Sequence, residues 1–285
     1  MKIIRQSTLG FTRTDLVTTL GLAAILLTLF GRSVTQTRAG QEGVTCLGNK
    51  RQLMLALHLY TVENADFLPP MMDLSSGVPG QNWLFHTAHI APDGTNHMKL
   101  IDSNSSMLAP YLDGNYGVFK CPADTSTIPT GTGPRPRVRS ISMSHSVGTN
   151  PMSVGAKTAT DGAWLDGNHG HLANRQYRTY ARLADIVNPR PSQLFVFLDE
   201  APESINDAAF GNQGPLPSGT GYRWIDWPAT YHNRSAGFAF ADGHAEIKMW
   251  VGSGTLLSPP TIAGGAMNDL HWIATHTTAF VSEQP

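Results

Sequence analysis

An uncharged run near the N-terminus, Leu16 to Gly31, constrains this 285-residue chain more than any other feature. As a helix, the run would rise about 24 Å, close to the hydrocarbon thickness of a membrane, about 30 Å. Lys2, Arg5 and Arg13 precede it, so the positive-inside rule places the following residues outside the cytoplasm. The alternative is a cleaved secretory signal, for which the small residues of GRSVTQTRAG are a poor match. We therefore expect a single-pass inner-membrane anchor carrying an extracytoplasmic domain.

The composition describes the domain beyond this run. Hydrophobic residues make up 41% of the chain, enough for a core. Twenty basic and 21 acidic residues leave a formal charge of -1 without a basic cluster, so we do not expect a nucleic-acid partner. With 28 Gly, 19 Pro and only 14% charged residues, much of the chain should run as turns and long loops.

The residues before the uncharged run, GFTRTD, resemble the cleavage motif of type IV prepilins. The resemblance implies that a prepilin peptidase cleaves between Gly10 and Phe11 and methylates the new amine. Asp15 would supply the counter-charge that a buried amine requires. The motif departs from the usual pattern by having Asp rather than Glu, and by polar Arg13 and Thr14. Residues 1–10 would then be a leader.

Two further segments of the N-terminal region follow from this motif. Residues 11–31 would form the transmembrane and assembly helix, and residues 32–66 an amphipathic continuation. The continuation places side chains at helical intervals of three or four: Cys46, Lys50, Leu53, Leu57 and Tyr60. Alternating leucines from 53 to 59 also fit a strand, but the good helix formers around them favour a helix that ends at FLPP, residues 67–70.

Four separated segments resemble the pilin-like proteins with an H-x9-DG processing-associated domain, common in planctomycete and verrucomicrobial bacteria and related to type II secretion pseudopilins. The segments are CLGNKRQLMLALHLYTVENADFLP (46–69), VFKCPAD (118–124), FVFLDEAPESINDAAF (195–210) and YHNRSAGFAFADGHAEIKMW (231–250). The H-x9-DG motif itself spans 232–243. The resemblance implies an α+β, pilin-like fold, in which a long N-terminal helix packs on a C-terminal antiparallel β-sheet with long loops, within a domain at 67–285.

Cys46 and Cys121 are the two cysteines of the chain. In an oxidising compartment they predict one disulfide, which would close a loop of about 75 residues. The alternative is a pair of buried free thiols. Because the sequence has neither a CxxC pair nor the Cys/His spacing of zinc sites, we do not expect structural zinc.

The C-terminal region predicts a sheet with a hairpin. LFVFL (194–198) suits a buried strand. GFAFA (237–241) and HAEIKMW (244–250) flank Asp242-Gly243, a type I′ hairpin pattern. The strand 237–241, which separates His232 from Asp242, would be about 17 Å long, so these two residues should not share a ligand.

If 194–198 runs antiparallel to 237–241, the acidic end of the first strand approaches His232. The predicted site then consists of Asp199, Glu200 and His232, with Asn206 and Asp207 from the next loop. Oxygen ligands suit Ca²⁺, and an imidazole favours a transition metal; related pseudopilins carry calcium in a C-terminal loop. Three interpretations stay open: structural hydrogen bonding, a structural divalent metal, or acid–base catalysis.

The expected function is that of a structural subunit rather than an enzyme. Helices packed side by side would form a type IV pilus or a type II secretion pseudopilus, a periplasmic or extracellular filament. Its partners would be copies of itself or other pseudopilins, the prepilin peptidase and the inner membrane. The alternative is a membrane-tethered binding protein that does not polymerise and holds a glycan or protein ligand through aromatic residues such as Trp224 and Trp227.

Overall fold

The computed structural model describes residues 13–72, 82–169 and 176–283. It divides into two units, Met1–Gln41 and Glu42–Pro285, and the helix α1 (Arg13–Glu63) begins in the first and ends in the second. The predicted leader and the cleavage position between Gly10 and Phe11 lie outside the described residues. Within the described part of the chain, no helix has both the length and the hydropathy of a membrane span.

The part of α1 in the second unit buries one face and exposes the other. Leu53, Met54 and Leu57 are fully buried, whereas Leu55 and Leu59 are 58% and 43% exposed. This pattern has the period of a helix and not of a strand, so the predicted helix is confirmed over these residues. The helix ends where Ala65 and Asp66 take left-handed backbone conformations, with φ of 54° and 69°.

A five-stranded sheet forms the centre of the second unit. Its order is β5-β3-β4-β6-β7, made by β3 (Ile141–Ser144), β4 (Phe195–Asp199), β5 (Ala209–Phe210), β6 (Ser235–Phe240) and β7 (Ala245–Met249). The pairs β3–β4, β4–β6 and β6–β7 are antiparallel, as predicted for 194–198 and 237–241.

One pair in this sheet departs from the predicted antiparallel arrangement. After β4 the chain crosses β3 and returns in the opposite direction as β5, which therefore pairs with β3 in parallel. The sheet is mixed, and the unit is α+β.

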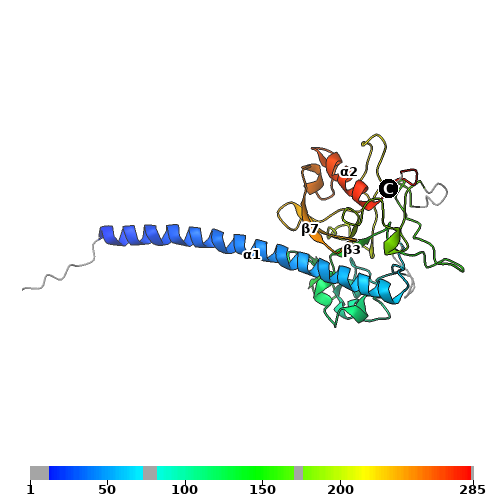
Figure 1. The fold of residues 1–285 in the computed structure, drawn as a ribbon. Coiled ribbons are helices and arrows are strands. Elements are labelled where there is room, and N and C mark those ends of the chain that lie inside the picture. The colour runs from blue at the N-terminus through cyan, green and yellow to red at the C-terminus, as the bar shows by residue number, and fades with distance from the viewer. Residues whose placement is uncertain (1–12, 73–81, 170–175, 284–285) are drawn as a thin grey trace, which may run out of the picture. The chain divides into compact units, whose positions relative to one another are not determined.

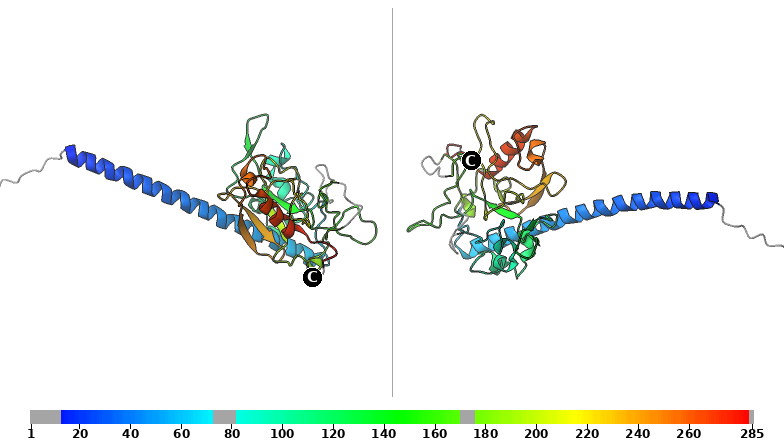
Figure 2. Two further views of the ribbon diagram at one scale, coloured as in Figure 1. Left: turned by 90° about the horizontal axis from the view of Figure 1, so that it is seen from above. Right: turned by 180° about the vertical axis from the view of Figure 1, so that it is seen from behind.

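The two faces of the sheet carry side chains of different size. On β6, Ala239 packs with the α1 residues, while Phe238 and Phe240 pack on the opposite side in a second cluster. The C-terminal helix α2 (Ala266–Thr277), which the sequence analysis did not predict, covers this second face with Ile273. Figure 1 and the right-hand view of Figure 2 show α2 and the end of α1 on opposite sides of the sheet.

A β-bulge in β4 sets which residues face α1. The pairing with β6 shifts between Phe195 and Phe197, and both Val196 and Phe197 join the cluster that contains the α1 residues. Phe195 and Leu198 lie in the other cluster. Because one extra residue reverses the alternation of a strand, Asp199 faces α1.

Asp242 and Gly243 lie in the turn between β6 and β7, but this turn is not of type I′. Type I′ needs positive φ at both central residues, and of the two only Gly243 has it, at 95°. The Gly243 N–H donates to the carbonyl of Phe240, and the Phe240 N–H to that of His244. The connection is therefore a three-residue loop, residues 241–243, ending in a left-handed glycine.

The long connections contain only short elements. A two-stranded ribbon pairs β1 (Thr127–Ile128) with β2 (Arg135–Pro136). Among the described residues, the connections also contain short 3-10 turns: η1 (Asp93–Thr95), η2 (His97–Leu100), η3 (Ala109–Tyr111), η4 (Tyr116–Phe119), η5 (Leu183–Asp185) and η6 (Gly254–Leu256).

Candidate metal and thiol site

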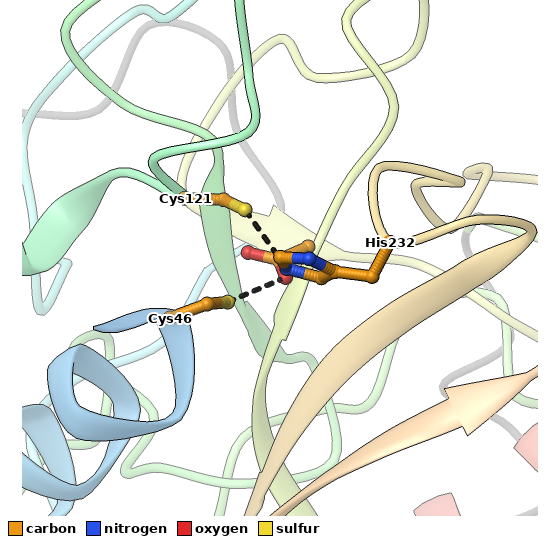
Figure 3. A group of neighbouring side chains, drawn as sticks. Cys46, Cys121 and His232 are labelled. Carbon is orange, nitrogen blue, oxygen red and sulfur yellow. Dashed lines mark hydrogen bonds between the residues drawn. The ribbon is translucent and has the colours of Figure 1, made fainter. Parts of the chain in front are cut away.

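Four side chains from four separate segments meet between α1 and the sheet. Cys46 comes from α1, Cys121 follows η4, Asp199 ends β4 and His232 precedes β6. One ligand atom from each lies within 4.8 Å of all the others. Figure 3 shows Cys46, Cys121 and His232 pointing toward one another.

Two contacts between side chains of this cluster are within about hydrogen-bond distance. The Sγ of Cys46 lies 3.2 Å from Oδ2 of Asp199. The Sγ of Cys121 lies 3.1 Å from Nε2 of His232. Both cysteines and Asp199 are fully buried, and His232 is half-buried. The site thus combines two sulfur atoms, one nitrogen and one carboxylate oxygen in an almost dry environment.

Lys50 lies one helical turn after Cys46 and joins the cluster as its cation. Its Nζ donates to Oδ1 of Asp199 at 2.6 Å and to Sγ of Cys46 at 3.4 Å. Neither partner of the Lys50–Asp199 ion pair is exposed to solvent. A buried ammonium is stable only with such partners, so Lys50 marks a region of concentrated negative charge.

Gly237 of β6 closes the site from the side of the sheet. Its N–H donates to Oδ2 of Asp199 at 3.0 Å. A Cβ at this position would come within 2.9 Å of Asp199 Oδ2 and Lys50 Cε, and 3.1 Å from Cys46 Sγ. The absence of a side chain at Gly237 therefore provides the space that the cluster occupies.

The two thiols have opposite acidities. A hydrogen bond from Cys121 lowers the pKa of Cys46 to about 3, against the effect of burial, and the charge of Lys50 lowers it further. The same hydrogen bond, together with burial, raises the pKa of Cys121. His232 has a raised pKa because it bonds to Cys46 and is attracted by its charge, although burial opposes the shift. Cys46 is therefore the more acidic thiol of the two.

Burial also acts on the pKa values of the Lys50–Asp199 ion pair. Burial raises the pKa of Asp199 to about 7, and Lys50 opposes that shift. For Lys50, burial alone would lower the pKa, but the charges of Asp199, Cys46 and Cys121 raise it above the usual value. The ammonium is therefore retained in the core.

The structure brings together two of the five residues predicted as metal ligands, Asp199 and His232. Glu200 follows Asp199 on the strand and accepts hydrogen bonds from Ser142 and Ser204, at 2.5 Å and 2.8 Å. Successive residues of a strand point to opposite faces, which separates the two carboxylates.

Asn206 and Asp207 stabilise their own loop instead. The Asn206 side chain accepts from the Asp207 N–H, and the Asp207 carboxylate accepts from the Ala209 N–H. Asp242 lies in the exposed turn beside His244, 2.6 Å from its ring nitrogen. Asp242 and His232 therefore do not share a site, as the length of the strand between them predicted.

The predicted disulfide is not formed in the structure, where Cys46 and Cys121 are both free and buried. The two cysteines nevertheless lie in the same cluster, with their Sγ atoms within 4.8 Å of each other. The predicted alternative, two buried thiols, corresponds to the arrangement observed. The geometry permits three chemistries: thiol oxidation, metal ligation and thiolate reactivity.

A pocket of about 720 Å³ adjoins the cluster. Thr45 and Asn49 of α1 line one side of it, and Cys121 contributes to its wall. Lys120, Arg135 and a mixture of polar and apolar neighbours line the rest. The pocket therefore borders the cluster, while the Cys121 side chain itself is fully buried.

Sequence reasoning missed the roles of four residues in this cluster: the two cysteines as neighbours of Asp199 and His232, Lys50 as counter-charge and Gly237 as a spacer. One local pattern pointed to them, because Cys46 and Lys50 are four residues apart and so share a helix face with apolar side chains. A second pattern was the alternation of small and large residues in GFAFA, which marks the face that α1 approaches.

Comparison with protein-family models, with curated proteins and with solved structures found no match for this chain. The function is therefore argued from the residues and the geometry of the structure.

Proposed function

We propose that this protein is a pilin-like or pseudopilin-like structural subunit, processed by a prepilin peptidase and assembled through its N-terminal helix into a filament. The GFTRTD motif before an uncharged run and the H-x9-DG segment support this function by resemblance. The inner membrane would hold the subunit before assembly, with the second unit outside the cytoplasm. Its partners would be copies of itself or other pseudopilins.

The observation that carries the proposal is the exposure of apolar side chains on the N-terminal part of α1. Leu16, Val17 and Leu20 are 51%, 68% and 61% exposed. Burying the exposed part of each would contribute about 1–2 kcal/mol, so a helix with this surface is stabilised by lipid or by neighbouring helices. A subunit that exchanges lipid for identical helices on assembly accounts for such a surface.

A second group of exposed apolar side chains lies on α1 within the second unit. Leu55, Leu59 and Val62 are spaced by four and three residues and are 58%, 43% and 80% exposed. They lie on one face of the helix, opposite to the residues that pack on the sheet. In the proposed filament this face would contact the next subunit.

The alternative function, a tethered binding protein that does not polymerise, is favoured by the pocket of about 720 Å³. Its volume suits a small ligand, and its lining mixes polar with apolar residues. The aromatic residues first considered for such a role contribute less, since Trp224 packs into the core clusters and donates its indole N–H to Thr261. The two functions differ in whether the protein forms filaments.

The deciding experiment is intact mass measurement and N-terminal sequencing of the protein extracted from membranes of its own cells. A mature chain that starts at N-methylated Phe11 would support the pilin route. A start beyond Arg38 would show an ordinary secreted domain and would overturn it. Electron microscopy of material sheared from the cells then separates the two functions, because only the subunit forms filaments.

A further inference from the structure

We propose that Cys46, Cys121, Asp199 and His232 form a four-coordinate site for a structural Zn²⁺ ion. This site shares Asp199 and His232 with the divalent-metal site predicted from the sequence but adds two cysteines, and it departs from the expectation that the chain has no structural zinc. The inference is independent of whether the protein forms filaments.

The positions of the donor atoms fit tetrahedral coordination. Zinc binds thiolates at about 2.3 Å and imidazole or carboxylate at about 2.0–2.2 Å, which separates neighbouring ligand atoms by roughly 3.3–3.8 Å. The donor atoms of the site lie at 3.2 Å for Cys46–Asp199 and 3.1 Å for Cys121–His232, and no pair exceeds 4.8 Å. Movements of about 1 Å or less would complete the tetrahedron.

The charges of the site balance when zinc is present. Two thiolates and one carboxylate supply three negative charges, the zinc ion supplies two positive charges, and His232 is neutral. Lys50, 2.6 Å from Asp199 and 3.4 Å from Cys46, provides the remaining positive charge. A buried site of zero net charge avoids the desolvation penalty of an unpaired ion, which accounts for an ammonium in the core.

The groups around the ligands hold them in place. Asp199 directs Oδ1 to Lys50, while its Oδ2 accepts from the Gly237 N–H and faces Cys46. Lys50 also donates to Cys46, so one cation orients two ligands. Supporting hydrogen bonds of this kind are typical of metal sites.

The ligand types select the metal. Sulfur and imidazole ligands favour zinc, whereas Ca²⁺ takes six or more oxygen ligands. Four protein ligands also leave no coordination position for a substrate, which is typical of structural rather than catalytic zinc.

The ion would join four parts of the second unit at one point. It would connect α1 to the segment after η4, to the end of β4 and to the loop before β6. The chain distances between the ligands are long, 153 residues from Cys46 to Asp199 and 111 from Cys121 to His232. The unfolded chain does not hold such distant ligands together, so the free energy of zinc binding would add directly to the stability of the folded protein.

The test uses the full-length protein, extracted in detergent from its own cells without chelator or added thiol. Elemental analysis should give one zinc per chain. Exchange with Co²⁺ should produce the absorption of tetrahedral cobalt with a thiolate-to-cobalt charge-transfer band. Cys46→Ser, Cys121→Ser and His232→Ala should each reduce the bound metal to near zero.

His244→Ala is the matched control, because His244 lies in the exposed turn of the same hairpin and should leave one metal per chain. The cobalt spectrum of the unsubstituted protein is informative even if a cysteine variant fails to fold. Three outcomes would overturn the proposal: cobalt bound without a thiolate band, metal retained in Cys46→Ser, or a metal-free protein whose two cysteines resist alkylation until reduced. The last outcome would establish the disulfide in place of the metal.

Discussion

Lys50 and Asp199 form an ion pair of 2.6 Å across 149 residues of sequence, with neither side chain exposed to solvent. The pair joins α1 to the end of β4, and it lies directly beside the two cysteines. Removing one member of a buried pair leaves a charge without a partner, which is far more destabilising than the loss of a surface pair. The strongest effects of substitution should therefore appear here.

Lys50→Met should destabilise the protein by about 3–5 kcal/mol, because it leaves Asp199 buried without its counter-charge. Chemical denaturation followed by tryptophan fluorescence measures this change in the free energy of unfolding. Arg51→Met is the control: Arg51 is the exposed neighbour on the same helix, and its loss should change stability by about 0.5 kcal/mol or less. Equal effects of the two substitutions would contradict the role assigned to the ion pair.

Gly237→Ala should disrupt the cluster by adding a methyl group where three atoms already lie within about 3 Å. We expect a loss of about 1–3 kcal/mol in stability and faster alkylation of Cys46. Gly48→Ala provides the comparison, because a Cβ at Gly48 meets nothing within 4 Å and alanine favours a helix. If Gly237→Ala were as stable as Gly48→Ala, the proposed lack of space would be wrong.

The folded protein should lose stability on acidification through His86. Burial lowers the pKa of His86 to about 2, with the charge of Arg139 acting in the same direction. In the unfolded chain a histidine takes up a proton below pH about 6.5, so the stability that neutral His86 contributes is present above that pH and is lost as the pH falls. Between pH 7 and pH 5 this group alone should remove about 2 kcal/mol.

The measurement compares unfolding of wild type and His86→Asn at both pH values. The wild type should lose about 2 kcal/mol more than the variant on acidification. His89→Asn, three residues away at an exposed position, should retain the wild-type pH dependence. Parallel losses in wild type and His86→Asn would show that His86 is already charged in the folded protein.

Asp15→Ala should leave processing intact and impair filament assembly. In the proposed filament, Asp15 neutralises the amine of Phe11 within an apolar helix bundle, where an unpaired charge costs several kcal/mol. We expect filament yield to fall by about tenfold or more, measured as sheared protein per cell against the amount of mature subunit. Thr18→Ala, one turn further along α1, is the matched control. Normal filament yield from Asp15→Ala would contradict the role of Asp15 as the counter-charge of the Phe11 amine.

The sequence alone predicted the elements around the site better than the site itself. The buried face of α1 through Leu53 and Leu57, the buried strand at Phe195 and the antiparallel neighbour of that strand all follow from local periodicity and were found. The approach of Asp199 to His232 followed from the direction of those two strands. Local patterns thus determine which faces are buried and how paired strands run.

The remaining features depend on contacts that no local pattern encodes. Loops bring Cys121 to the cluster, so no spacing in the sequence indicates that it lies close to Cys46. Zinc spacings identify ligands that come in adjacent pairs, and here each ligand comes from a different segment. Glu200 was grouped with Asp199 because they are neighbours in sequence, but neighbours on a strand face opposite ways.

Because His232 and Gly237 lie in the last fifth of the chain, the cluster cannot be completed until nearly the whole polypeptide is available. A chain cut short before these residues would still carry Cys46, Lys50 and Asp199, but without the strand that covers them. Such a fragment would present charged and sulfur-bearing side chains to water and to proteases. The cluster therefore forms only in a chain that extends at least as far as Gly237.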